Sequence, residues 1–146
     1  MTYTVLIFVT RKKGMTPYQF KEHFEEVHVP LIYKITGPHF PKYHNRSYIQ
    51  RTPDNSANLS ESDNSNAKWP ATSLLGPGLE PDFDAIAELV FNDEARCKRF
   101  FEMIKQEDAQ RALAADEELF LDRGKLKAVV LDGVITNHNC AQPALE

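Results

Sequence analysis

Two histidines on one predicted helix, His23 and His28, carry the side chains best suited to moving protons near neutral pH. At 100° per residue, each lies about 60–80° to one side of the apolar stripe of that helix, at the boundary between core and solvent. His28 also falls in the last predicted turn, where the helix dipole favours a protonated imidazole. The spacing makes His28 a candidate acid or base, with capping of the last carbonyls as the alternative, and His23 a surface residue. The stripe consists of Phe20, Phe24, Val27 and Leu31.

Two acids, Asp84 and Glu88, share one face of the strand predicted from the sequence FDAIAELVF. A carboxylate among aliphatic side chains is costly unless it is paired or functional. A carboxylate beside an imidazole orients the ring and raises its basicity, so Asp84 is a candidate partner for His28. In the alternative interpretation, Asp84 is solvated at the start of the strand and Glu88 pairs with Arg46 or Lys127.

Aromatic and polar side chains gather between the end of this helix and the next predicted strand, KYHNRSYIQR. Tyrosine and histidine donate hydrogen bonds to a carbonyl or phenolate oxygen while their rings line an apolar pocket. That combination suits a flat, oxygenated aromatic ligand. The alternative is an ordinary amphipathic surface, which is the better interpretation for His39. With His44 as a further catalytic candidate, the candidate substrate-binding residues are Tyr33, Tyr43, Tyr48, Trp69 and Glu88.

Several common catalytic motifs do not occur in the sequence. It has no phosphate-binding loop and no GxGxxG, which argues against nucleotide and dinucleotide cofactors. It has no HExxH, no cysteine cluster and no Gly-x-Ser-x-Gly elbow, and Cys97 and Cys140 stand far apart. The sequence therefore predicts acid–base chemistry in an enclosed pocket, with no cofactor and no metal.

The elements that must position these groups follow the order strand, helix, strand, strand, helix, strand. The first helix is marked by Thr16 as N-cap, Pro17 at the first helical position and Gln19 completing a capping box. Pro30 is expected to close or kink this helix. The order predicts an α+β, ferredoxin-like fold in one domain over residues 1–146, with a four-stranded antiparallel sheet and the helices on one face.

The boundaries of the other elements follow from the alternation of apolar and polar residues and from residues that cap or end helices and strands. Strands are predicted over residues 2–10, 42–51, 83–91 and 126–135. A helix capped by Asn92 or Asp93 and a second helical stretch over residues 108–121 lie between the last two strands. The segment 52–81 is too long for an ordinary connection and is a possible lid, and residues 136–146 form a C-terminal tail.

The second face of the predicted sheet also carries apolar side chains, which need a cover. A second copy of the same sheet is the simplest cover, so a homodimer with a barrel-like interior is expected. The residues assigned to this face are Leu6, Phe8, Ile86, Val90 and Leu131.

The composition fits one globular domain. The 146 residues are 42% apolar and 26% charged, with a net charge of −4, which argues against a protein that binds nucleic acid by neutralising phosphates. No apolar run approaches the roughly eighteen residues that indicate a membrane span. The N-terminus is apolar before it is basic, the reverse of a secretory signal, so a cytoplasmic location is expected.

Two stretches resemble a known family. PYQFKEHFEEVHVPLI, with its His28-x-Pro30-Leu31, and the later DFDAIAELVFND are similar to the EthD-domain family of the dimeric α+β barrel superfamily. The resemblance implies a ferredoxin-like fold, a dimer formed by packed sheets and a ligand cavity between sheet and helices. It makes His28 the strongest catalytic candidate and places Asp84 in the matching strand motif.

Within that family, the length, the YHNR stretch and the long central insertion resemble small fungal enzymes of aromatic polyketide pathways, including decarboxylases of atrochrysone carboxylic acid-type products. The expected function is therefore a cofactor-free lyase that decarboxylates an aromatic β-keto acid. In it, His28 is the hydrogen-bond donor or general acid, Asp84 supports it, and His44 or Tyr43 holds a second oxygen. The alternatives are a dehydratase or cyclase, a cofactor-free anthrone-type oxygenase, and a non-catalytic ligand-binding dimer.

Overall fold

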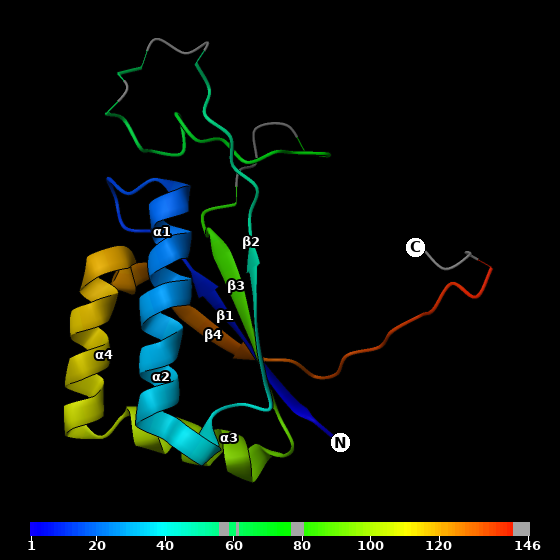
Figure 1. Cartoon of the computed structure of the whole chain (residues 1–146). Coiled ribbons are helices and arrows are strands. Elements are labelled where there is room, and N and C mark those ends of the chain that lie inside the picture. The colour runs from blue at the N-terminus through cyan, green and yellow to red at the C-terminus, as the bar shows by residue number, and fades with distance from the viewer. Residues whose placement is uncertain (56–58, 61, 77–80, 142–146) are drawn as a thin grey trace.

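A four-stranded antiparallel sheet forms one layer of the molecule (Figure 1). The computed structural model describes residues 1–55, 59–60, 62–76 and 81–141. The strands lie in the order β2-β3-β1-β4, as the ferredoxin-like pattern predicts. Their bounds are β1 Tyr3–Val9, β2 Tyr43–Tyr48, β3 Ala85–Phe91 and β4 Lys127–Val130.

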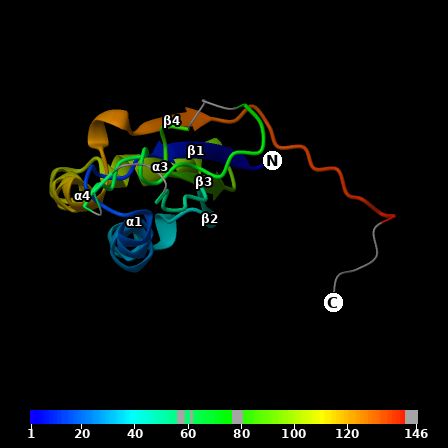
Figure 2. The same ribbon diagram turned by 90° about the horizontal axis from the view of Figure 1, so that it is seen from above.

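The helices form the second layer, on one side of the sheet (Figures 1 and 2). None of the described helices is long and apolar enough to cross a membrane. The α+β prediction is confirmed, and the second crossover contains two helices, as the two helical stretches expected there predict. The bounds are α1 Pro17–His23, α2 Val29–Thr36, α3 Glu94–Ile104 and α4 Glu107–Phe120.

The first helix begins where its capping box predicts. The Thr16 hydroxyl accepts from the Gln19 N–H, and the Gln19 side chain accepts from the Thr16 N–H. Pro30 does not close the helix, because a π-helical turn over Phe24–His28 joins α1 to α2 and the helix continues past the proline. A wider turn moves the carbonyl with which a proline ring would otherwise clash.

The π-helical turn also moves the buried stripe by one residue. Phe20 and Phe24 are buried as predicted, but the next buried residue is His28, which is 6% exposed, and Val27 is 45% exposed. The inserted residue rotates the helix that follows, so a count at 100° per residue misplaces every later position. His28 therefore lies inside the protein and not at its boundary.

The two faces of the sheet differ as the alternation predicts. On β3, Ala85, Ala87, Leu89 and Phe91 are buried against the helices. Phe8 pairs with Ile86 across the sheet on the opposite face, which also carries Leu6 and Val90 and which no described helix covers (Figure 2).

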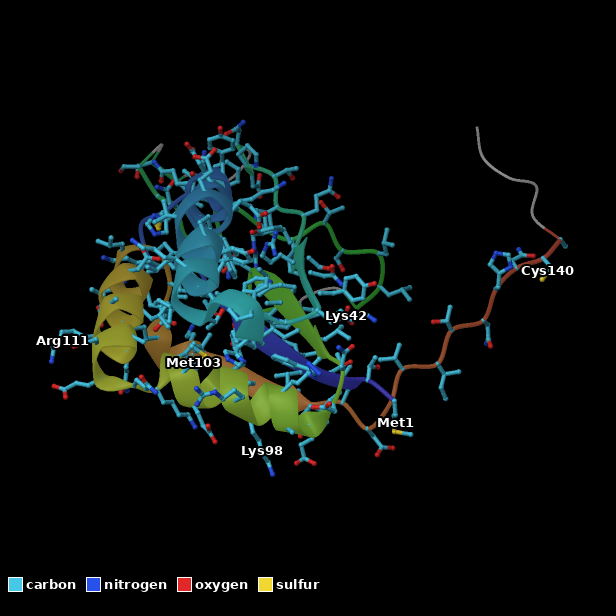
Figure 3. All side chains as sticks on the ribbon, turned by 60° about the horizontal axis from the view of Figure 1, so that its bottom comes forward. Met1, Lys42, Lys98, Met103, Arg111 and Cys140 are labelled. Atoms are coloured by element: carbon cyan, nitrogen blue, oxygen red, sulfur yellow. The ribbon has the colours of Figure 1, made fainter. Side chains whose placement is uncertain are left out.

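The last strand is shorter than predicted. β4 ends at Val130, and after Leu131 bonds to Thr4 the chain leaves the sheet (Figure 1). The last residue of β4 that pairs with β1 is Val130, opposite Val5. Figure 3 shows the side chains of this segment, including that of Cys140, standing clear of the domain.

Candidate functional site

A cavity of about 170 Å³ lies between the helix-covered face of the sheet and the helices. Three polar side chains, those of His28, His44 and Glu117, are among the residues that line it. The rest of its described lining is apolar and contains no lysine or arginine. A dry cavity of about 150 Å³ accommodates benzene, so this one has room for about one aromatic ring. A cavity is thus present between the sheet and the helices, where the family resemblance implies one.

His28 is held by a carboxylate on α4. Its Nδ1 lies 2.8 Å from Oδ2 of Asp116, and Oδ1 of the same carboxylate lies 2.7 Å from Nε2 of His23. The expected partner, Asp84, does not fill this role, so that pairing is corrected to Asp116. His23, expected at the surface, is half-buried and bonded to the same acid.

The contact with Asp116 sets the protonation of His28. A carboxylate accepts hydrogen bonds, so Nδ1 of His28 carries the proton and Nε2 holds a lone pair. Among the described residues, no group hydrogen-bonds to this Nε2. Burial lowers the pKa of His28, although the hydrogen bond to Asp116 opposes that shift. His28 is thus neutral at pH 7 and able to accept a proton at Nε2.

His44 has the opposite arrangement. Nη1 of Arg46 lies 3.0 Å from Nδ1 of His44, and because a guanidinium only donates, this Nδ1 must be an acceptor. The proton of the neutral ring is then on Nε2. Burial, followed by the charge of Arg46, lowers the pKa of His44 to about 4. The cavity therefore contains one imidazole that accepts at Nε2 and one that donates from Nε2.

Glu117 is the third polar group of the lining. Burial raises its pKa, and its Oε1 lies 3.4 Å from Nε of Arg123, beyond the end of α4. Neither Glu117 nor Asp116 was among the residues expected from the sequence. A signal was present, because both acids lie between Leu113 and Phe120, the buried positions of this helix.

Asp84 is bonded to two buried arginines instead of a histidine. Its carboxylate accepts from the backbone N–H of Arg11 at 2.8 Å, is also bonded to the Arg11 guanidinium, and lies 2.8 Å from Nε of Arg51. The two arginines in turn donate to the carbonyls of Asn64 and Trp69 in the long loop. Asp84 thus anchors the loop at the end of the sheet.

The five expected substrate-binding residues are not among those that line the cavity. Tyr48 is half-buried, with its hydroxyl bonded to a carboxylate, and Tyr33 is 60% exposed. Tyr43 and Glu88 lie on the other face of the sheet, and Trp69 lies in the anchored loop.

No described residue of 52–81 lines the cavity, so the role of this loop as a lid stays a prediction. Residues 56–58, 61 and 77–80 of the loop, and 142–146 of the tail, lie outside the described residues.

Comparison with known proteins agrees with this architecture. Residues 12–124 match the EthD domain family. An ethyl tert-butyl ether D (EthD) family protein from Bacillus halodurans is 16% identical, with 92% of this chain and 100% of that chain covered and a TM-score of 0.52. An EthD-like protein from Ralstonia eutropha is 10% identical, with 97% of each chain covered and a TM-score of 0.51. The comparison with curated proteins found no match.

Proposed function

The chain belongs to the EthD-domain family, and on that basis we propose that it is a cofactor-independent lyase that decarboxylates an aromatic polyketide β-keto acid. The observation that carries the proposal is the pair of neutral histidines with opposite hydrogen-bonding roles in an apolar cavity. The sequence resemblance to fungal enzymes of aromatic polyketide pathways supports the choice of substrate.

The reaction needs a hydrogen-bond donor at the ketone oxygen and a base that takes up the proton of the carboxylic acid. Nε2–H of His44 donates to the ketone oxygen, and Nε2 of His28 takes the proton of the carboxylic acid. The bond between the α-carbon and the carboxyl carbon breaks, carbon dioxide leaves, and the electron pair forms an enolate held by His44. The His28 imidazolium, stabilised by Asp116, then returns its proton to the α-carbon. His28 thus acts first as a base and then as the acid that the sequence predicts.

The apolar lining favours the same step. The described lining contains no lysine or arginine to stabilise a carboxylate. A carboxyl group that enters leaves water, and loss of neutral carbon dioxide moves the poorly solvated charge from the carboxylate to the enolate oxygen, to which His44 donates. Room for about one ring means that the reacting end of a larger polyketide enters and the rest lies at the mouth.

A second candidate reaction uses the same groups. An acceptor at His28 Nε2 suits removal of a proton beside a carbonyl, which begins a dehydration or an aldol ring closure. Release of carbon dioxide distinguishes the decarboxylase from this dehydratase or cyclase, and a requirement for dioxygen identifies an oxygenase.

We also propose that the protein works as a homodimer. The support is the apolar face of the sheet that no described helix covers, with Leu6, Phe8, Ile86 and Val90 on it. Two such faces packed together would remove these side chains from water, at about 25 cal/mol for each Å² of apolar surface.

The proposed function is tested by incubating the purified protein, without added cofactor, with a freshly generated aromatic β-keto acid under nitrogen and under air. Carbon dioxide and the organic products are followed by mass spectrometry. We expect release of carbon dioxide under nitrogen, faster than the spontaneous reaction. A product that contains oxygen from air, formed without acceleration under nitrogen, would contradict the proposal and identify an oxygenase.

The pH dependence of this reaction should reflect the lowered pKa of His28. The neutral ring is the active form, and it is present above its pKa and lost as the pH falls through it. The midpoint of the decline at low pH should therefore lie below 6.5, the ordinary pKa of histidine. Initial rates from pH 4.5 to 8 check this. A midpoint above pH 6.5 would show that another group controls the rate.

A further inference from the structure

Arg46 and Glu25 lie outside the reacting groups but control one of them. We propose that this ion pair is the positioning device that keeps His44 a permanent hydrogen-bond donor toward the cavity. The inference rests on the proposed function for its role in catalysis. Its structural content, the fixed tautomer of His44, can be measured without any substrate.

Arg46 contacts His44 at two points. Both residues lie on β2, two positions apart and so on the same face of the sheet. Nη1 of Arg46 donates to Nδ1 of His44 at 3.0 Å and to the His44 carbonyl at 2.6 Å. Because the guanidinium has donors only, this contact excludes a proton on Nδ1. The neutral ring must then keep its proton on Nε2.

Glu25 holds Arg46 in place. Its two carboxylate oxygens lie 2.5 Å from Nε and 2.9 Å from Nη2 of Arg46, the forked geometry that guanidinium and carboxylate prefer. The Tyr48 hydroxyl donates to the same carboxylate at 2.5 Å. The hydrogen bond from Arg46 lowers the pKa of Glu25, and the one to Glu25 raises that of Arg46, so both stay charged.

The π-helical turn links the two halves of the site. Glu25 and His28 both belong to this turn. One local distortion of the helix therefore positions the base, His28, directly and the donor, His44, through Glu25 and Arg46. The charged or titratable groups that act on His44 are Arg46 and His28, which disfavour its protonation, and Glu25, which favours it. With burial, the balance keeps His44 neutral at pH values well above 4.

Long-range proton–nitrogen NMR of the histidine rings tests the inference. In the wild type, we expect His44 to show an unprotonated Nδ1 and a protonated Nε2, with no charge until the pH approaches 4. In Arg46→Met, which removes the donors but keeps an unbranched side chain, we expect both tautomers and a pKa closer to 6.5. Arg46→Lys, which retains one donor, should restore the Nε2–H form in part.

The matched control is Arg99→Met, an exposed arginine of α3 that pairs with Glu102, and it should leave the His44 signals unchanged. A proton on Nδ1 of His44 in the wild type would overturn the inference, as would an unchanged His44 spectrum in folded Arg46→Met. In the decarboxylation assay, Arg46→Met should lower kcat tenfold or more with little change in KM. Failure of that assay in the wild type would contradict the proposed function and leave the NMR result intact.

Discussion

Replacement of His28 by alanine is expected to lower the rate of carbon dioxide release by about 10²–10⁴-fold, the usual contribution of a positioned acid–base group. The reason is that Nε2 of His28 is the acceptor that the buried Asp116 orients from the far side of the ring. Initial rates with a β-keto acid under nitrogen measure the effect. Circular dichroism and the thermal midpoint show whether the variant is folded.

The matched control for this variant is His39→Ala. His39 lies in the short turn after α2 and is not among the residues that line the cavity, so its removal should leave the rate within about twofold of the wild type. Asp116→Asn should fall between the two, because an amide has no charge to stabilise the His28 imidazolium. A folded His28→Ala protein that works at the wild-type rate would remove His28 from the mechanism.

Replacement of Asp84 by alanine is expected to destabilise the fold by about 3–5 kcal/mol, the cost of leaving a buried charge without its partner. The side chains of Arg11 and Arg51 are 4% and 0% exposed, and both guanidinium groups are bonded to the Asp84 carboxylate. Removal of the carboxylate leaves two buried cations side by side. Urea unfolding followed by fluorescence or circular dichroism measures the free energy of unfolding.

Asp82→Ala is the control, because Asp82 is exposed and close in sequence to Asp84. Its free energy of unfolding should stay within about 0.5 kcal/mol of the wild type. If Asp84→Ala also stayed within that range, the arginines would have found other partners, and Asp84 would not be the anchor of the loop.

The fold was predictable because its signals are local. The capping box at Thr16, the cap at Asp93 and the alternation along β3 each depend on neighbours in the chain, and all are present in the structure. The uncovered apolar face follows from the same alternation, since Phe8 and Ile86 fall on one side of the sheet when Val9 and Ala85 are buried on the other.

The site was predictable only in part, because its pairings are not local. His28 and His44 both line the cavity as expected, but the sequence offers several acids as partners for His28. Asp84 and Asp116 differ mainly in what folding brings near them: two arginines in one case and two histidines in the other. The π-helical turn has no reliable sequence signature. Placing residues at 100° each around a regular helix therefore could not predict that His28 is buried.

The central claim is that His28 transfers a proton at a carbon beside a ketone, while His44 donates to the ketone oxygen and no cofactor takes part. Deuterium exchange tests this claim most directly. An enzyme that returns a proton to the α-carbon must also remove it from the ketone product. In heavy water, proton NMR should show that the α-hydrogens of that ketone exchange faster with the wild-type protein than in buffer alone. His39→Ala should exchange them at the wild-type rate, and His28→Ala at the rate in buffer. Exchange at the buffer rate with the wild type, while the ketone is bound, would contradict the account.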